Sequence, residues 1–118
     1  MSTGEYIAVI GASDDAAKYG HKVFAYLLGE GRSVVPIHPN GGTLLGAARY
    51  RTIAELPMTP TLVVTVVPPA VTEEIVKQCI ARGVPAIWMQ PGSESDAAIA
   101  RARAAGITVT RNACIMLQ

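Results

Sequence analysis

Short apolar runs alternate along the chain with segments that have helical spacing. The runs are rich in β-branched residues and apolar at nearly every position, which is typical of strands covered on both faces. They lie at Tyr6–Ile10, Ser33–Ile37, Leu62–Val67, Ala86–Met89 and Ile107–Thr110. This pattern predicts five main strands of a parallel sheet.

Three of the intervening segments carry apolar residues three and four positions apart, the period of one helix face. These stripes run over Val23–Leu28, Val71–Ile80 and Ala98–Ala105. Pro69 suits the first turn of the second helix, where a missing N–H costs nothing. Ser93 followed by Asp96 resembles a capping box at the start of the third helix.

Strand–helix alternation at this spacing predicts an α/β fold. We expect a Rossmann-like, doubly wound parallel sheet of about five main strands with helices on both faces, in the strand order 3-2-1-4-5 along the sheet. The segment Gly41–Pro57 fits neither texture, and we expect a loop there, with a short strand near Arg49–Arg51 and a helical turn at Ile53–Leu56. Without repeats, linkers or low-complexity tracts, residues 1–118 are expected to form a single domain.

Composition narrows the functional classes. The net charge is +1 and no run of Lys or Arg forms a patch, which argues against a nucleic-acid partner. The longest apolar tract, Leu62–Val71, is broken by a threonine and two prolines, so no membrane span is expected. Cys79 and Cys114 match neither a disulfide framework nor a metal-ligand spacing. We therefore expect no metal site and a reduced, cytoplasmic protein without a secretory leader.

Ligands of open parallel sheets bind at the edge where the carboxyl ends of the strands meet. The segments that follow the five predicted strands are short and rich in glycine and proline. They are Gly11-Ala12-Ser13, His38-Pro39-Asn40, Pro68-Pro69, Gln90-Pro91-Gly92 and Arg111-Asn112-Ala113-Cys114. This composition predicts a groove in which a ligand approaches the backbone closely.

The first of these segments carries the strongest signal for an anion. A buried strand stops at Gly11 and a helix resumes near Gly20. Gly11 permits a sharp turn, and the N–H groups of the loop, with the Ser13 hydroxyl, can face a phosphate. Lys18 adds one positive charge. The alternative is a plain strand–turn–helix connection whose glycine only makes the turn.

The chain departs from the dinucleotide-binding pattern in two places. The second glycine of that pattern is replaced by Ser13, and the acidic residue that would hold an adenosine ribose is replaced by His38 and Pro39. Both departures argue against NAD and leave a 2′- or 3′-phosphorylated ribose possible.

The remaining candidates for chemistry are isolated. Cys79 lies on a helix stripe and is expected to be an inert core thiol. Cys114 follows the last strand, where it either meets a ligand thiol or packs as a structural residue. His21 is expected to be a surface or capping residue, and Trp88 a core residue. The sequence contains no convincing Ser–His–Asp set, carboxylate pair or metal-ligand cluster.

Six segments carry a family resemblance. They are Ala8-Val-Ile-Gly-Ala-Ser-Asp14, Lys18-Tyr-Gly-His-Lys-Val23, His38-Pro-Asn-Gly-Gly42 with Leu45-Gly46, Val66-Val-Pro-Pro69, Ala86-Ile-Trp-Met-Gln90 and Asn112-Ala-Cys114. In this order, over nearly the whole chain, they resemble the small stand-alone CoA-binding proteins. These are similar to the N-terminal CoA-binding domain of the succinyl-CoA ligase α subunit and of ADP-forming acetyl-CoA synthetases.

The resemblance implies how CoA would lie. Its diphosphate would contact the first loop, its adenosine the second loop and the end of the third strand, and its pantetheine arm the end of the fourth. The binding residues so predicted are Gly11, Ala12, Ser13, Lys18, Gly20, His38, Pro39, Asn40, Val67, Pro68, Met89, Gln90 and Pro91. Two positions depart from the family pattern: Asn40 replaces a frequent lysine, and Ile115 replaces the proline that usually follows the late cysteine.

Three functions remain open at this stage. The favoured one is a non-catalytic protein that binds CoA or acyl-CoA, working alone, as a homo-oligomer or with a larger ligase-like partner. The second is an oxidoreductase or transferase that uses NADP or another nucleotide, which would need an oligomer to complete its substrate site. The third is an interaction protein whose groove has lost its ligand, an option that Asn40 keeps open.

Overall fold

Five parallel strands form the central sheet of residues 4–118, the part of the chain that the computed structural model describes. They are β1 (Ile7–Ile10), β2 (Val34–Ile37), β5 (Leu62–Thr65), β6 (Ala86–Met89) and β7 (Thr108–Thr110). All pairings between them are parallel, in the order β2-β1-β5-β6-β7. The predicted α/β class and the five main strands are confirmed.

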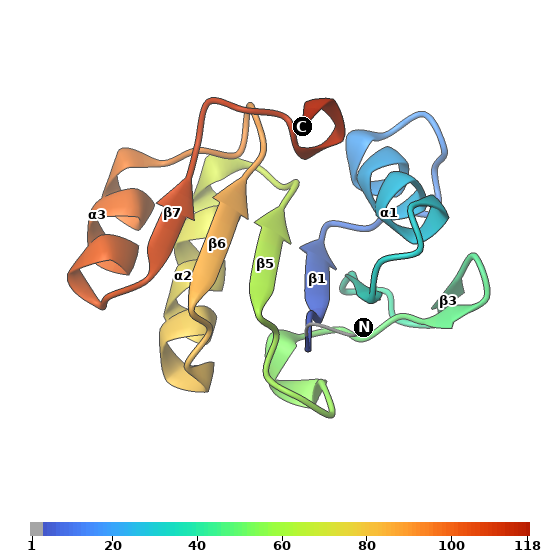
Figure 1. Cartoon of the computed structure of the whole chain (residues 1–118), viewed down its shortest axis with the longest axis horizontal. Helices are drawn as coiled ribbons and strands as arrows, with labels where there is room; N and C mark the ends of the chain where they lie inside the picture. The colour runs from blue at the N-terminus through green and yellow to red at the C-terminus, as the bar shows by residue number, and fades with distance from the viewer. Residues whose placement is uncertain (1–3) are drawn as a thin grey trace.

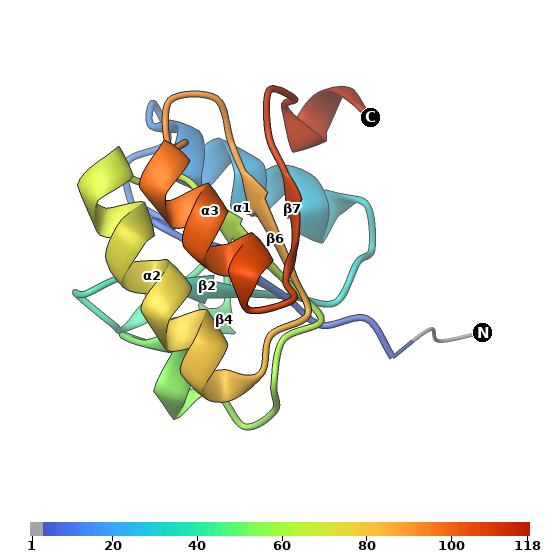
Figure 2. The same ribbon diagram turned by 90° about the vertical axis from the view of Figure 1, so that its left-hand side faces the viewer.

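Helices cover both faces of this sheet (Figures 1 and 2). The helix α1 (Tyr19–Gly29) lies on one face, and α2 (Pro69–Arg82) and α3 (Asp96–Ala104) lie side by side on the other. Successive strand residues point to opposite faces, so β1 contributes to two cores. Ile7 and Val9 pack with α1, whereas Ala8 and Ile10 belong to the cluster that includes residues of α2 and α3.

The predicted strand order is wrong, because the third long strand, β5, pairs with β1 instead of β2. The chain after β2 forms a hairpin of β3 (Thr43–Leu44) and β4 (Ala47–Ala48) in place of a crossover helix. Tyr50 then occupies the outer edge of β2: its N–H donates to Pro36 O (3.1 Å) and its carbonyl accepts from His38 N (2.9 Å). The edge on which β5 was expected is therefore already hydrogen-bonded.

The rest of the irregular segment agrees with the sequence-based expectation. A strand-like bridge joins Tyr50 to Ile37, within the short strand expected near Arg49–Arg51. The 3₁₀ turn η1 (Ile53–Glu55) lies where a helical turn was expected. Arg82, near the end of α2, donates to the carbonyls of Ile53 (3.0 Å) and Leu56 (2.8 Å) and so holds this turn beneath the helix.

Helix α3 begins two residues later than its predicted capping box. Ser95 is the N-cap, and its Oγ accepts from Ala98 N (3.2 Å). Ser93 is instead buried behind the end of β6, where its hydroxyl lies 2.8 Å from both Gln90 O and Thr65 Oγ1. Its polar atom closes the turn at the carboxyl edge of the sheet and is not free to cap a helix.

Two glycines bring the backbone after β1 against the first turn of α1. A Cβ placed on Gly20 would overlap the Gly11 carbonyl oxygen. Gly11 itself has a φ of +93°, and a Cβ there would overlap the Val66 carbonyl oxygen. The strand end, the loop and the helix start can therefore pack at this distance only without side chains at these two positions.

Gly20→Ala should destabilise the fold strongly, since the added methyl must displace backbone atoms. We expect a loss of at least about 1–3 kcal/mol in the free energy of unfolding, measured by urea denaturation. Gly29→Ala, at the other end of α1 with no atom within 4 Å of the added Cβ, should stabilise by about 0.5–1 kcal/mol through helix propensity. Equal effects of the two substitutions would contradict the close-packing account.

Candidate functional site

The carboxyl ends of the strands lie at one edge of the sheet, at the top of Figure 1, where the C-terminal segment also lies. Three neighbouring cavities follow this edge. The first, of about 550 Å³, is lined by Gly11, His38, Pro39, Arg51, Val67 and Gln78, among others. The second, of about 400 Å³, is lined by Val67, Pro68, Tyr19 and Pro91, among others. The third, of about 420 Å³, is lined by Tyr19, Val66, Gln90, Pro91, Cys114, Met116 and Leu117.

The cavities share residues and so form one track along the edge. Val67 lines the first and second cavities, and Tyr19, Val66 and Pro91 line both the second and the third. We call these three cavities together the edge track. It brings together residues from the ends of β1, β2, β5 and β6, as the sequence predicts.

In the loop after β1 the first N–H groups are hydrogen-bonded, and those in the middle of the loop are not. The N–H groups of Gly11 and Ala12 both donate to the Ile37 carbonyl (2.9 and 3.1 Å). Ser13 Oγ accepts from Asp15 N (3.0 Å). Within residues 4–118 the N–H groups of Ser13 and Asp14 donate no hydrogen bond. The donors that the loop leaves for an anion are therefore the two adjacent N–H groups and the serine hydroxyl. The N–H groups of Gly11 and Ala12, which the sequence also suggested, are already used.

Arg49 fixes this loop, and sequence reasoning missed it. Its side chain is only 4% exposed, although it is charged. It donates from Nη1 to Ala12 O (2.9 Å), from Nε to Gly41 O (2.6 Å) and from Nη2 to Asp14 Oδ2 (3.2 Å). One guanidinium thus joins the first loop to the second. The sequence gives no signal for it beyond an arginine in the segment that lacked a clear pattern.

The two histidines hold the loops by hydrogen bonds. His21 Nδ1 lies 2.9 Å from Ser13 O, so His21 ties α1 to the first loop and does not act as the helix cap that the sequence allowed. His38 Nδ1 accepts from Asn40 N (3.2 Å), so the neutral ring carries its proton on Nε2. Partial burial, followed by the nearby Arg49 charge, lowers the pKa of His38 below its usual value. His38, which lines the first cavity, is therefore neutral at pH 7 and adds no charge to it.

Other predicted site residues fall in different environments. Lys18 and Asn40 are exposed beside the loops. Gly20 is buried in the packing described above. Met89 is 0% exposed and belongs to the core on the α2 and α3 side, and it lines none of the three cavities. Of the three residues predicted at the end of β6, only Gln90 and Pro91 line the third cavity.

The two cysteines lie in different environments. The core position predicted for Cys79 is confirmed, whereas both roles considered for Cys114 fit its position. Cys79 is completely buried, and burial raises the pKa of its thiol to about 12, so it is an inert core residue. Cys114 is half-buried, lines the third cavity and accepts a hydrogen bond from Gln90 Nε2 (3.3 Å). Trp88, expected in the core, is only partly buried and donates to Ala113 O (2.8 Å), which ties β6 to the chain after β7.

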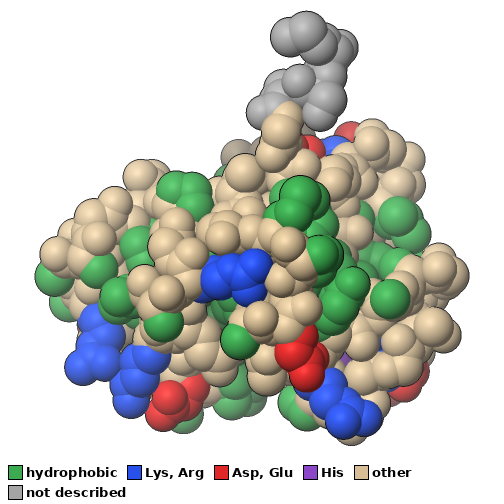
Figure 3. All heavy atoms as spheres, turned by 90° about the horizontal axis from the view of Figure 1, so that it is seen from below, with side chains coloured by type: hydrophobic (Ala, Val, Ile, Leu, Met, Phe, Trp, Pro, Cys, Tyr) green, Lys and Arg blue, Asp and Glu red, His purple; other side chains and the backbone are tan. Residues whose placement is uncertain are grey.

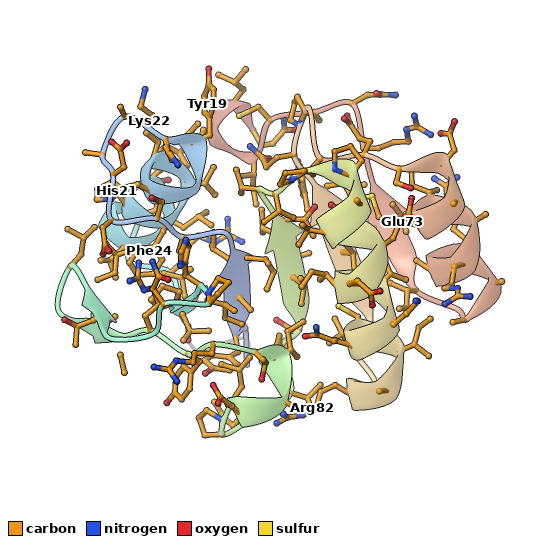
Figure 4. The ribbon with its side chains drawn as sticks, turned by 180° about the vertical axis from the view of Figure 1, so that it is seen from behind. Tyr19, His21, Lys22, Phe24, Glu73 and Arg82 are labelled. Atoms are coloured by element: carbon orange, nitrogen blue, oxygen red, sulfur yellow. The ribbon has the colours of Figure 1, made fainter. Side chains whose placement is uncertain are left out.

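Tyr19 is the second residue that sequence reasoning missed. It starts α1, is 66% exposed, and lies beside the C-terminal turn η2 (Ile115–Leu117) in Figure 4. Its ring also carries the ammonium of Lys22, 5.4 Å from the ring centre. The phenol therefore forms an exposed aromatic wall between the second and third cavities.

The opposite end of the sheet shows no patch of one charge. In Figure 3, which views that end, Lys and Arg side chains are scattered among hydrophobic ones, and some lie beside Asp or Glu. Within residues 4–118 no group of three His, Cys, Asp or Glu side chains is placed to hold a metal ion. No helix in the same range is long and apolar enough to cross a membrane.

Comparison with known proteins decides the family. A sequence profile described as a CoA binding domain matches residues 5–118. The chain belongs to the CoA-binding domain family. The match spans every strand and helix described above, so the edge track is the part of this family fold at which a ligand is to be sought.

Relatives of this CoA-binding domain include both small and large proteins. A conserved hypothetical protein from Pyrococcus furiosus shares 36% sequence identity, with a TM-score of 0.91 over 96% of this chain and 97% of the other. The dinucleotide-forming acetyl-coenzyme A synthetase 1 of Ca. Korarchaeum cryptofilum, solved with phosphate and ADP, shares 28% identity with a TM-score of 0.81 over 90% of this chain and 25% of its own.

A curated relative is the α subunit of an ADP-forming acetate–CoA ligase II from Pyrococcus furiosus. It is 34% identical over 79 residues, which is 66% of this chain. The matched region spans only 17% of the ligase subunit's length. Similar domains thus occur both nearly alone and as a small part of a CoA ligase.

Arg49→Met should loosen the two loops that Arg49 joins. The substitution keeps an apolar stem of similar length but leaves the Ala12 and Gly41 carbonyls without their donor. We expect a loss of about 2–6 kcal/mol in the free energy of unfolding, from two orphaned acceptors at about 1–3 kcal/mol each.

The matched control is Asp14→Asn, which removes the other charge of the same pair. Asp14 is 66% exposed, so this change should cost less than about 1 kcal/mol. Urea denaturation measures both. A cost for Arg49→Met no larger than that for Asp14→Asn would contradict the assignment of Arg49 as the link between the loops.

Proposed function

We propose that this chain is a non-catalytic cytoplasmic protein that binds CoA or acyl-CoA along the edge track. The observation that carries the proposal is the pair of unused N–H groups at Ser13 and Asp14, in the loop whose first residue, Gly11, lines the first cavity of a CoA-binding domain. Backbone N–H groups at a helix-initiating loop are suited to a diphosphate. The net charge of +1 provides little long-range attraction, so phosphate binding depends on such local donors.

The shape of the track suits a long ligand with a charged middle. CoA carries an adenosine at one end, a diphosphate in the middle and a flexible pantetheine arm at the other. In our proposal the adenosine lies in the first cavity, near His38 and Pro39, and the diphosphate contacts Ser13. The arm then passes Pro91 toward Cys114, where the thiol or an acyl group lies in the third cavity.

The proposal of a non-catalytic role is supported by the side chains along the track. The ionisable groups of the third cavity are the Tyr19 phenol and the Cys114 thiol, and neither has a hydrogen-bonded general base beside it. His38, in the first cavity, would lie at the adenosine end and far along CoA from its thiol. In the ligase relatives the matched region is only 17–25% of the chain, so in our proposal any chemistry on the bound CoA is supplied by a larger partner or another copy of the chain.

CoA should raise the melting temperature of the purified protein, and NAD should not. A ligand present at 100 times its dissociation constant adds about 2.7 kcal/mol to the free energy of unfolding. The chain lacks the second glycine and the ribose-binding acid of the NAD pattern. Differential scanning fluorimetry with CoA, acetyl-CoA, NADP and NAD checks this. A larger shift with NADP than with CoA would favour the nucleotide-dependent enzyme instead.

Ser13→Ala should weaken CoA binding with little change in stability. The hydroxyl lies in a half-buried loop, and the lost hydrogen bond to a charged phosphate is worth about 1.5–3 kcal/mol. Isothermal titration calorimetry measures the change. Ser33→Ala is the matched control, because Ser33 is exposed before β2 at the other end of the sheet and should leave the affinity unchanged. Unchanged affinity in Ser13→Ala would mean that the loop is only a connection.

A further inference from the structure

One cationic side chain at the first cavity remains without a charged partner. Arg51 lines this cavity and is exposed, and among residues 4–118 its guanidinium takes part in no ion pair. The neutral His38 adds no charge. The one carboxylate in the lining, Glu74, lies 3.3 Å from Lys77 Nζ. Arg51 is therefore the cationic side chain of the lining that is available to pair with a negatively charged group in this cavity.

The backbone places Arg51 against the second loop. Its own N–H donates to Glu55 Oε1 (2.8 Å), which fixes the residue before η1. Its side chain packs over Gly41, where an added Cβ would lie 2.9 Å from Arg51 Nε. Gly41 is held in turn by Arg49, through Nε to Gly41 O, and by its N–H to His38 O (3.0 Å). The guanidinium thus lies beside the turn that contains Asn40.

The side of the first cavity formed by apolar residues and Gln78 favours the adenine base of a bound nucleotide. Ile10, Ile37 and Ile75 supply apolar surface. Gln78, also in the lining, has an amide oxygen that is buried and has no hydrogen-bond partner among the described residues. Such an oxygen is costly unless a donor reaches it. The exocyclic amino group of adenine is a donor of this kind, so the observations favour the base inside and the ribose at the mouth.

Resting on the proposed function, we propose that Arg51 binds the 3′-phosphate of CoA and makes the site selective for CoA over dephospho-CoA. With the base inside and the diphosphate at Ser13, the ribose lies between the first and second loops. Its 3′-phosphate then projects toward the Gly41 turn and the guanidinium, whose planar fork suits a phosphate. Arg51 thereby supplies the positive charge that Asn40 does not.

The test is calorimetric titration of wild type and Arg51→Gln with CoA and with dephospho-CoA, at one fixed ionic strength. Wild type should bind CoA about 10- to 100-fold more tightly than dephospho-CoA, the range of one charge-assisted hydrogen bond. In Arg51→Gln the affinity for CoA should fall to that for dephospho-CoA, whose own affinity should not change. Arg51→Lys keeps the charge and should restore most of the difference.

The remaining outcomes overturn either the role of Arg51 alone or the proposed function as well. If wild type binds CoA and dephospho-CoA equally, the role of Arg51 is wrong while the proposed function stands. The same holds if Arg51→Gln weakens both ligands alike, or if Arg103→Gln, an exposed charge removed from α3, abolishes the preference as well. If wild type binds neither ligand, the proposed function itself fails and the role of Arg51 fails with it.

Discussion

The backbone after β1 passes the first turn of α1 at a distance that side chains would prevent. Gly20 lies against the Gly11 carbonyl, and Gly11 lies against the Val66 carbonyl. Because the loop begins in this contact, the N–H groups of Gly11 and Ala12 are directed to Ile37 and those of Ser13 and Asp14 are left over. The candidate anion site is thus a consequence of how tightly a strand, a loop and a helix pack.

A buried charge completes this arrangement. Arg49 takes the Ala12 and Gly41 carbonyls as partners, so the first and second loops are held at a fixed separation before any ligand arrives. Pre-ordered loops reduce the entropy that binding must overcome. Asp14, the anionic partner of Arg49, is mostly exposed and contributes little to this. The rigid part of the contact is the link from guanidinium to backbone.

The helices and strands that could be predicted from sequence are those whose formation depends on residues within the same segment. Continuous β-branched runs mark buried strands, and Pro69 begins α2 as predicted. The strand order depends on a contact that no local pattern reveals, the pairing of Tyr50 with the edge of β2. The cap of α3 was misplaced for a similar reason: Ser93 and Ser95 are equally good capping residues, and only the tertiary partners of Ser93 decide between them.

The residues of the candidate site also fall into two groups, those that local sequence pattern could place and those that it could not. Gly11, Ser13 and His38 follow strands, so their place at the edge follows from topology. Met89 ends a strand too, but its side chain points into the core, which the sequence could not show because the strand is apolar at nearly every position. Arg49 and Arg51 come from the segment without periodicity, so their positions could be found only in the folded chain.

Nuclear magnetic resonance of the backbone amides during a CoA titration tests the central claim most directly. The account predicts that the largest chemical-shift changes occur at the N–H groups of Ser13 and Asp14, which CoA would hydrogen-bond. Smaller changes are expected for residues at the ends of β2, β5 and β6. Saturable changes confined to the opposite end of the sheet, or none at Ser13 and Asp14, would contradict it.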